Sequence, residues 1–272
     1  MKQLFLAFIF TFSFTLSCVA DNWIVCGEQG FSGHIQGIAA DESGIYWSFF
    51  DTLLKTDYNG KKLFFYKSVP HCGDICIAEG KIYVTMGLYK NKNIKEHNGH
   101  RSWIFVHDAK DLKLLKKHKI HCSLPDGIAF ADGRFYVGSS PGKELHKLNP
   151  LLVYDKNFNL LKQYDLDIEV PTRYGIQTLN IVNGKLLASF YSKLNHGVFF
   201  KLNDFSKMES LFPVNTSYGA AVVPEKIAGT KNVFLIAHSS GTKKNYSAKL
   251  LTVKYNNGKL IPFKLPQTVN KQ

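Results

Sequence analysis

Five segments of the chain repeat one arrangement of short apolar strands and turns, and this repetition restricts the fold more than any other feature. Each segment opens with an apolar strand, passes through a turn and returns in a second strand; the five openings read QGIAADESGIYWS (36–48), GDICIAEGKIYVT (73–85), DGIAFADGRFYVG (126–138), QTLNIVNGKLLAS (177–189) and YGAAVVPEKIAGTKNVFLIA (218–237). The spacing between equivalent residues is constant in the first four segments. Tyr46 follows Gly37 by nine positions, as Tyr136 follows Gly127. Self-similarity at a fixed period is typical of architectures built from repeated units.

A second pair of strands follows each opening and completes a unit of four strands. These pairs cover residues 53–66, 103–118, 151–166, 198–212 and 249–265. Short alternating strands between Gly, Asn and Asp turns are typical of antiparallel sheet, and four-stranded units arranged radially are the blades of a propeller. The sequence therefore predicts an all-β fold, a five-bladed β-propeller of four-stranded antiparallel blades. A β-sandwich or a β-solenoid is the alternative architecture.

Two further segments bear on how this ring is built. Residues 22–30 (NWIVCGEQG) lie ahead of the first repeat, and we expect them to add an outer strand to the last blade and close the ring. A six-bladed ring closed by this segment is the alternative count. Residues 110–119 (KDLKLLKKHK) come closest to a helical pattern, but they occupy the position of a fourth strand, and we expect a strand there.

The first 20 residues have the pattern of a signal peptide. Lys2 is followed by the apolar run 4–16, which is too short to span a bilayer comfortably, and small residues at 18–20 precede a cleavage point before Asp21. We therefore expect a signal peptide over 1–20, a single β-propeller domain over 21–272, and a secreted or periplasmic protein. An uncleaved anchor and a lipid anchor at Cys18 are the alternatives. No other segment is long and apolar enough to cross a membrane.

The charge of the chain points to an anionic partner. The formal net charge is +13 at pH 7, and a basic surface attracts phosphates, carboxylates, sulfates and anionic polymers. Export argues against nucleic acid as that partner. We expect a monomer that binds an anionic small molecule or polysaccharide.

Four cysteines remain after the expected cleavage, namely Cys26, Cys72, Cys76 and Cys122. Disulfides form in oxidising compartments, and four thiols allow two bridges and three pairings. Cys72 and Cys76 are expected on the same face of one strand, which disfavours a bond between them. We expect one disulfide and favour Cys72–Cys122 among the pairings; packed free thiols are the alternative.

Histidines gather in the loops that a propeller collects on one face. That face receives the loop before the first strand of each blade and the loop between its second and third strands. Eight of the ten histidines map to these loops: His34, His71, His97, His100, His121, His146, His196 and His238. Lysine and arginine map to the same loops, so we expect an electropositive face that concentrates anions.

These loops supply the candidate site residues. A histidine beside a tyrosine can act as acid and base near neutral pH, and an arginine can neutralise a substrate carboxylate. We expect catalytic groups among His34, His71, His121, Arg173, Tyr174 and Tyr218. We expect substrate-binding groups among Gln36, Gln177, His100, Arg101, Lys193 and His238. Neutral imidazoles also bind transition metals, which is the alternative role for these histidines.

One blade resembles a known family. The segment 124–137 (LPDGIAFADGRFYV) is similar to blades of the SMP-30/gluconolactonase and NHL-type propellers. Metal-dependent members of the lactonase family hold a divalent cation near the central tunnel with acidic residues and an Asn. The resemblance implies one divalent metal ion, calcium or zinc, at Asp74 and Asp126, while no Glu matches the family's acidic ligand.

A weaker resemblance is to plant-type glutaminyl cyclases, which are small five-bladed propellers. It rests on residues 176–190 (IQTLNIVNGKLLASF). The family's inner-strand acid has no direct match, because Asp74 stands one position later. Its tryptophan-lined pocket has no match either, since Trp23, Trp47 and Trp103 are the only tryptophans.

Three functions remain in competition. The first is an exported lyase or hydrolase that acts on an anionic carbohydrate or a related small substrate. The second is a metal-dependent lactonase or esterase of the SMP-30 type. The third is a non-catalytic propeller that binds carbohydrate or protein. A lectin with one site per blade should repeat its ligand residues, whereas the loops here differ strongly between blades, so we favour the enzyme with a single asymmetric site.

Overall fold

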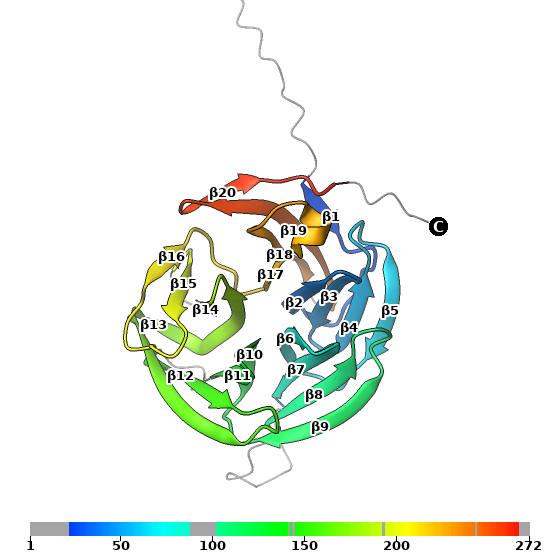
Figure 1. Cartoon of the computed structure of the whole chain (residues 1–272). Helices are drawn as coiled ribbons and strands as arrows, with labels where there is room; N and C mark the ends of the chain where they lie inside the picture. Colours follow the sequence, from blue (N-terminus) through cyan, green and yellow to red (C-terminus); the bar gives the residue numbers. More distant parts are fainter. Residues whose placement is uncertain are drawn as a thin grey trace, which may run out of the picture.

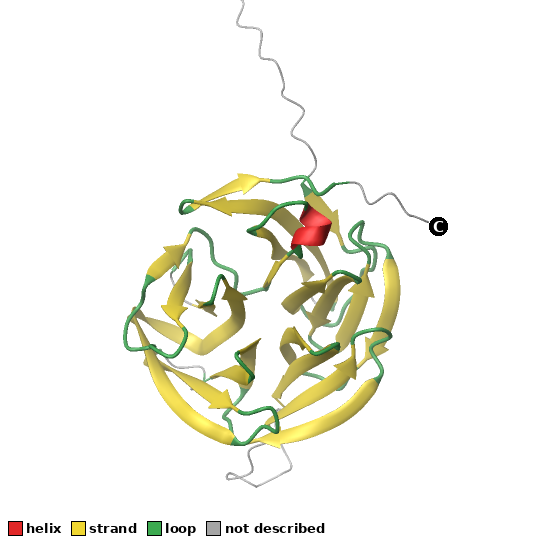
Figure 2. Ribbon diagram, viewed as in Figure 1, coloured by secondary structure: helices red, strands yellow, loops and turns green. Residues whose placement is uncertain are grey.

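The computed structural model describes residues 22–87, 102–140, 142, 145–191, 194–242 and 244–266. The strands are arranged as a ring around a central axis, and each sheet runs outward from that axis (Figure 1). Nearly all of the regular structure is strand (Figure 2), and the described residues contain one short helix, α1 (Glu225–Ala228), in the long turn of the fifth repeat. No helix in the described part of the chain is long and apolar enough to cross a bilayer.

Two four-stranded antiparallel sheets come from the first part of the chain. The first consists of β2 (Ile35–Asp41), β3 (Gly44–Phe49), β4 (Thr52–Thr56) and β5 (Lys62–Lys67). The second consists of β6 (Cys72–Ala78), β7 (Lys81–Gly87), β8 (Ser102–Asp108) and β9 (Leu114–Ile120). The strand β9 lies within the lysine-rich segment 110–119, which confirms the expectation of a strand there.

A seven-stranded sheet follows, and its long middle strand serves two units. It contains β10 (Pro125–Ala131), β11 (Arg134–Ser139), β12 (His146–Tyr154), β13 (Leu160–Val182), β14 (Lys185–Tyr191), β15 (Gly197–Lys201) and β16 (Ser210–Phe212). The first half of β13 pairs with β12 and its second half pairs with β14. The sheet therefore divides into two units of four strands that share β13.

The last sheet joins the two ends of the described chain. It contains β17 (Ala220–Val222), β18 (Val233–Thr242), β19 (Asn245–Asn256), β20 (Lys259–Pro262) and β1 (Trp23–Val25). Trp23 pairs with Leu251 while β20 pairs with the following stretch of β19. The expected outer strand from residues 22–30 is therefore confirmed over Trp23–Val25.

Neighbouring units are held together by apolar cores and by hydrogen bonds that repeat around the ring. Five clusters of buried apolar side chains lie between neighbouring units. Ser48 of β3 donates to the carbonyl of Gly73 at 2.6 Å, and Thr85 of β7 donates to the carbonyl of Asp126 at 2.5 Å. Each bond runs from a second strand to the inner strand of the next unit, so it satisfies a buried polar group and fixes the distance between units.

Asp74 fastens three inner strands at the axis. Its Oδ2 accepts the backbone N–H of Leu179 in β13 at 2.9 Å and that of Ile128 in β10 at 3.2 Å. The neighbouring Gly37 of β2 leaves room for this carboxylate, because a Cβ there would lie 2.2 Å from Oδ1 of Asp74. The glycine at this point of the repeat therefore serves the close approach of the strands at the axis.

The predicted Cys72–Cys122 disulfide is wrong, because the four cysteines of the described chain are free thiols. Cys72 packs in the core between the first and second sheets, whereas Cys122 packs in the core on the other side of the second sheet. Cys72 and Cys76 also face opposite sides, since a register shift between Cys72 and Ile75 reverses the alternation.

Thiol titration tests this correction. In a protein that begins at Asp21, we expect four reactive thiols after unfolding without reductant, from Cys26, Cys72, Cys76 and Cys122. The folded protein should react slowly, because burial raises the pKa of both Cys72 and Cys122 to about 12 and thiolate is the reactive form. Finding two thiols fewer, recovered after reduction, would restore the disulfide.

Candidate functional site

A histidine and three tyrosines meet where the loops enter the inner strands. Nε2 of His34 lies 3.0 Å from the hydroxyl of Tyr191, within hydrogen-bond distance. The rings of Tyr218 and His34 meet edge to face at 5.5 Å, and Tyr174 packs edge to face against Tyr191 at 6.3 Å. We call His34, Tyr174, Tyr191 and Tyr218 the tyrosine cluster.

The ends of different strands bring the tyrosine cluster together. His34 precedes β2, Tyr191 is the last residue of β14, and Tyr218 stands just before β17. Burial lowers the pKa of His34, so its imidazole is neutral at neutral pH. Burial raises the pKa of Tyr191, and the neighbouring Tyr218, Asp126 and Tyr174 raise it further, so this phenol keeps its proton. The pair is an un-ionised base and acid joined by one hydrogen bond.

Two of the predicted catalytic residues have a strained backbone. His71 has φ 80° and Tyr174 has φ 59°, both in the left-handed region that side chains other than glycine rarely adopt. Each turns the chain toward an inner strand. Burial, together with the nearby His34, lowers the pKa of His71 to about 4, so this imidazole is also neutral.

A buried carboxyl group lies beneath the tyrosine cluster. Asp126, at the start of β10, is 8% exposed. Gln177 donates to Oδ2 of Asp126 at 3.2 Å and to the carbonyl of Tyr174 at 3.1 Å, so it links this carboxyl to the cluster. Burial raises the pKa of Asp126 to about 7. Asp126 therefore gains or loses its proton near neutral pH, as acid–base catalysis requires.

A cavity of about 790 Å³ opens beside the tyrosine cluster. Its polar side carries Arg173, Asn215 and Ser217, and Arg173 is exposed. Asn215 is fixed by donating to the carbonyls of Phe190 and Leu194 at 3.1 and 3.0 Å. The rest of the lining consists of Tyr174, Tyr191, Tyr218, Leu145, Val170 and Pro171. Among the described residues, the cavity lining combines one cation, phenol groups and an apolar wall.

Other predicted site residues lie apart from this cavity. His121 is exposed in the turn before β10, and its carbonyl accepts the hydroxyl of Tyr154 at 2.9 Å. His238 packs edge to face against Trp23 at 5.0 Å. Gln36 lies half-buried in β2. The predicted His100, Arg101 and Lys193 lie outside the described residues.

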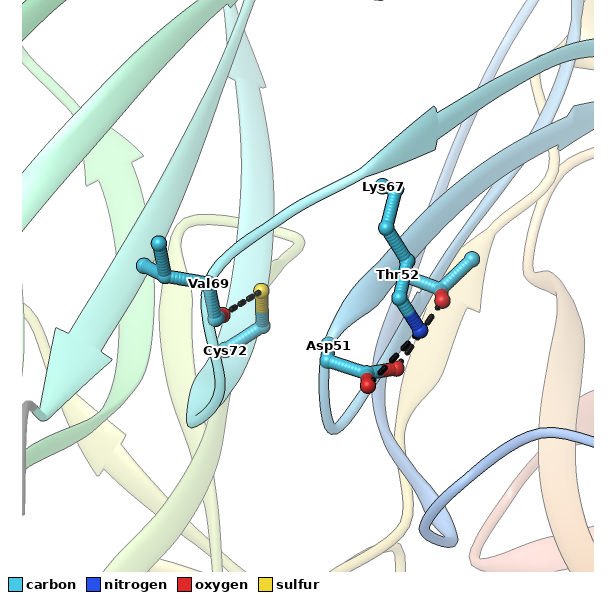
Figure 3. A network of polar contacts seen from close by, with 5 residues as sticks. All are labelled: Asp51, Thr52, Lys67, Val69 and Cys72. Carbon is cyan, nitrogen blue, oxygen red and sulfur yellow. Dashed lines mark hydrogen bonds and ion pairs between the residues drawn. The ribbon is translucent and has the colours of Figure 1, made fainter.

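The two acidic residues expected to bind a metal, and a third acid, Asp51, have other partners. Asp74 accepts two backbone N–H groups at the axis, and Asp126 is held by Gln177. Asp51 is paired with Lys67 at 2.7 Å and accepts the hydroxyl of Thr52 at 3.0 Å (Figure 3). Hydrogen bonds from Lys67, Ser32 and Thr52 hold the pKa of Asp51 below its usual value although burial opposes them. Among the described residues, no group of three His, Cys, Asp or Glu side chains converges as a metal site would require.

Sequence reasoning missed part of this site. Tyr191 falls in a loop expected on the functional face, and its position at the end of a second strand is the signal that points to it. Nothing in the local sequence marks Val170 and Pro171 as cavity residues. They line the cavity because β13 passes from one unit to the next at this point.

Comparisons with known proteins support a propeller of this general type. No protein-family model matches the chain, and no curated protein matches it. A glutaminyl cyclase from Myxococcus xanthus has a similar structure, with a TM-score of 0.57, 11% identity, and coverage of 82% of this chain and 93% of that one. The WD40 propeller domain of Doa1 (TM-score 0.46, 11% identity, 78% and 62% coverage) and the WD40 domain of Neurospora crassa Pan2 (TM-score 0.44, 8% identity, 85% and 77% coverage) are more distant.

The fold and the sheet order define the class of this protein as an all-β, propeller-like protein built from four-stranded antiparallel sheets. The expectation of a propeller is confirmed. The more specific resemblance to SMP-30-type lactonases finds no support in these comparisons. At 11% identity, the similarity to the cyclase shows the fold alone.

Proposed function

We propose that this chain is an exported, five-bladed propeller enzyme that cleaves a carboxylate-bearing carbohydrate by β-elimination. The count of five is supported by the shared strand β13, which divides the seven-stranded sheet into two units, and by the five inter-unit cores. The observation that carries the activity is the hydrogen bond of 3.0 Å between His34 and Tyr191, because Tyr191 lines the cavity together with Arg173.

β-Elimination needs three groups: a positive charge for the carboxylate, a base for the proton on carbon, and an acid for the departing oxygen. Arg173 pairs with the substrate carboxylate, which makes the proton on the adjacent carbon easier to remove. Neutral His34 takes that proton, and Tyr191 gives its hydroxyl proton to the departing glycosidic oxygen. The C–H and C–O bonds break, a C=C bond forms, and no water is consumed. Transfer of the proton from His34 to Tyr191 across their hydrogen bond restores both groups.

The first experiment separates elimination from hydrolysis. The purified protein is incubated with polygalacturonate, hyaluronan and pectin fragments, and unsaturated uronate is followed by its ultraviolet absorbance and by product mass. We expect new absorbance and products whose combined mass equals that of the substrate. Products heavier by one water per cut would make the enzyme a hydrolase, and no cleavage of any acidic glycan would reject the proposed function.

Substitution of the acid–base pair supplies the matching genetic test. We expect His34→Gln and Tyr191→Phe each to lower kcat about a hundredfold, because removing a positioned acid or base costs at least that factor. The control is His118→Gln, at a histidine of β9 that packs against Phe158 and does not line the cavity, and it should leave turnover unchanged. Full activity of His34→Gln in folded protein would contradict the assignment.

A second candidate function is the cyclisation of an N-terminal glutamine. It is favoured by the buried carboxyl of Asp126 beside the tyrosine cluster and by the similar fold of the Myxococcus xanthus glutaminyl cyclase. Arg173 at the cavity argues against it, because it would repel the ammonium group of that substrate. Ammonia release from a glutaminyl peptide, with no cleavage of acidic glycans, would select this function instead.

A further inference from the structure

The cavity has an apolar wall that elimination from a sugar acid does not require. Leu145, which lines the cavity, is 61% exposed and therefore open to a ligand there. Val170 and Pro171 continue the same wall from β13. A hydrophilic glycan alone would leave these three side chains in water or against hydroxyl groups.

Aromatic rings connect this wall to the reacting groups. Tyr218 is 37% exposed, and its ring packs against His34 at 5.5 Å. Tyr174 lies on the other side of Tyr191 and also lines the cavity. A ligand that occupies the cavity therefore contacts phenol rings next to Tyr191 and aliphatic groups at Leu145. Pockets that combine an apolar lining with a few placed polar groups bind amphipathic small molecules.

We infer that the substrate is an amphipathic carboxylate, a sugar acid that carries an apolar or aromatic substituent. The carboxylate binds at Arg173, and the substituent packs on the apolar wall of Leu145, Val170 and Pro171. This inference rests on the proposed function, because that function places the carboxylate and the sugar. It narrows the substrate class from long acidic polysaccharides to short uronides with an apolar group.

Calorimetric binding of two matched probes tests the inference without any need for turnover. The probes are methyl glucuronide and phenyl glucuronide, which differ only in the apolar substituent. We expect the phenyl compound to bind at least about tenfold more tightly, since pocket contacts of even one methylene discriminate by about tenfold or more. Leu145→Ser and Val170→Ser should remove this difference and leave methyl glucuronide binding as it was.

The matched control is Leu148→Ser, a similar change at a 50% exposed leucine of β12 that does not line the cavity. It should preserve the preference for the phenyl compound. Equal affinity for the two probes, or no binding of either, would overturn the inference. Preferential binding of phenyl glucuronide without cleavage of any acidic substrate would keep the inference and reject the proposed elimination. Cleavage of acidic glycans with no preference for the phenyl group would do the reverse.

Discussion

Replacing Asp74 by alanine should reduce the free energy of unfolding by about 2 to 6 kcal/mol. The substitution leaves the buried N–H groups of Ile128 and Leu179 without their acceptor, and each unsatisfied group costs about 1 to 3 kcal/mol. Whole domains are stable by only about 5 to 15 kcal/mol. We therefore expect Asp74→Ala to lose a large part of the free energy of unfolding, measured as a lower midpoint of urea denaturation followed by circular dichroism.

Asp74→Asn is the matched control for this prediction. Its amide oxygen can accept the same two N–H groups, and its volume leaves the contact with Gly37 unchanged. We expect it to keep most of the stability that Asp74→Ala loses. If Asp74→Ala remained within about 0.5 kcal/mol of the original protein, the range of an ordinary surface change, the three inner strands would not depend on this carboxyl group.

The free energy of unfolding should also fall as the pH rises from about 4 to about 7, because of Asp126. Burial raises the pKa of this group in the folded protein from 3.8 to about 7, so the folded state holds a proton that the unfolded chain releases. One pKa unit corresponds to about 1.4 kcal/mol, and the loss across the window is therefore about 4 kcal/mol. The stabilisation from the bound proton is fully present below pH 3.8, the pKa of Asp126 in the unfolded chain. It is lost as the pH rises through about 7, the pKa in the folded protein.

Urea denaturation at a series of pH values tests this dependence. Asp74 acts in the same direction, since burial raises its pKa as well, so the quantity to compare is the slope in the original protein against that in Asp126→Asn. We expect the variant to be less sensitive to pH and more stable at neutral pH. Asp132→Asn, at an exposed turn of the same sheet, is the control and should keep the original slope. Equal slopes for Asp126→Asn and the original protein would refute the prediction.

The strands were predictable because their signals are local. Alternating apolar residues and turn residues fix where each strand begins and ends, and the repeat then places the second pairs, as the lysine-rich β9 shows. The register shift after Cys72 was not predicted, although Gly73 inside the strand is a local sign of a bulge and three other units shift at the equivalent place. That shift is also why Cys72 and Cys76 face different cores.

The side-chain contacts of the site were harder to predict from the sequence, because the residues that touch are far apart in the chain. Tyr191 is 157 residues from His34, and Leu179 is 105 residues from Asp74. The repeat predicts that such residues lie on one face or near one axis, but it cannot say which side chains touch. The sequence therefore suggested Asp74 as a metal ligand, whereas in the structure its partners are the backbone N–H groups of Ile128 and Leu179.

The pairing of Trp23 with Leu251 has a consequence for the order of events during synthesis. The strand β1 has no partner until β19 has been made, so the ring cannot be completed on a partly made chain. Contacts between such distant residues also slow folding, since a long loop must close before they form. Until Leu251 has been made, the edge of Trp23–Val25 stays without its partner strand, and an unpaired edge can pair with another chain instead.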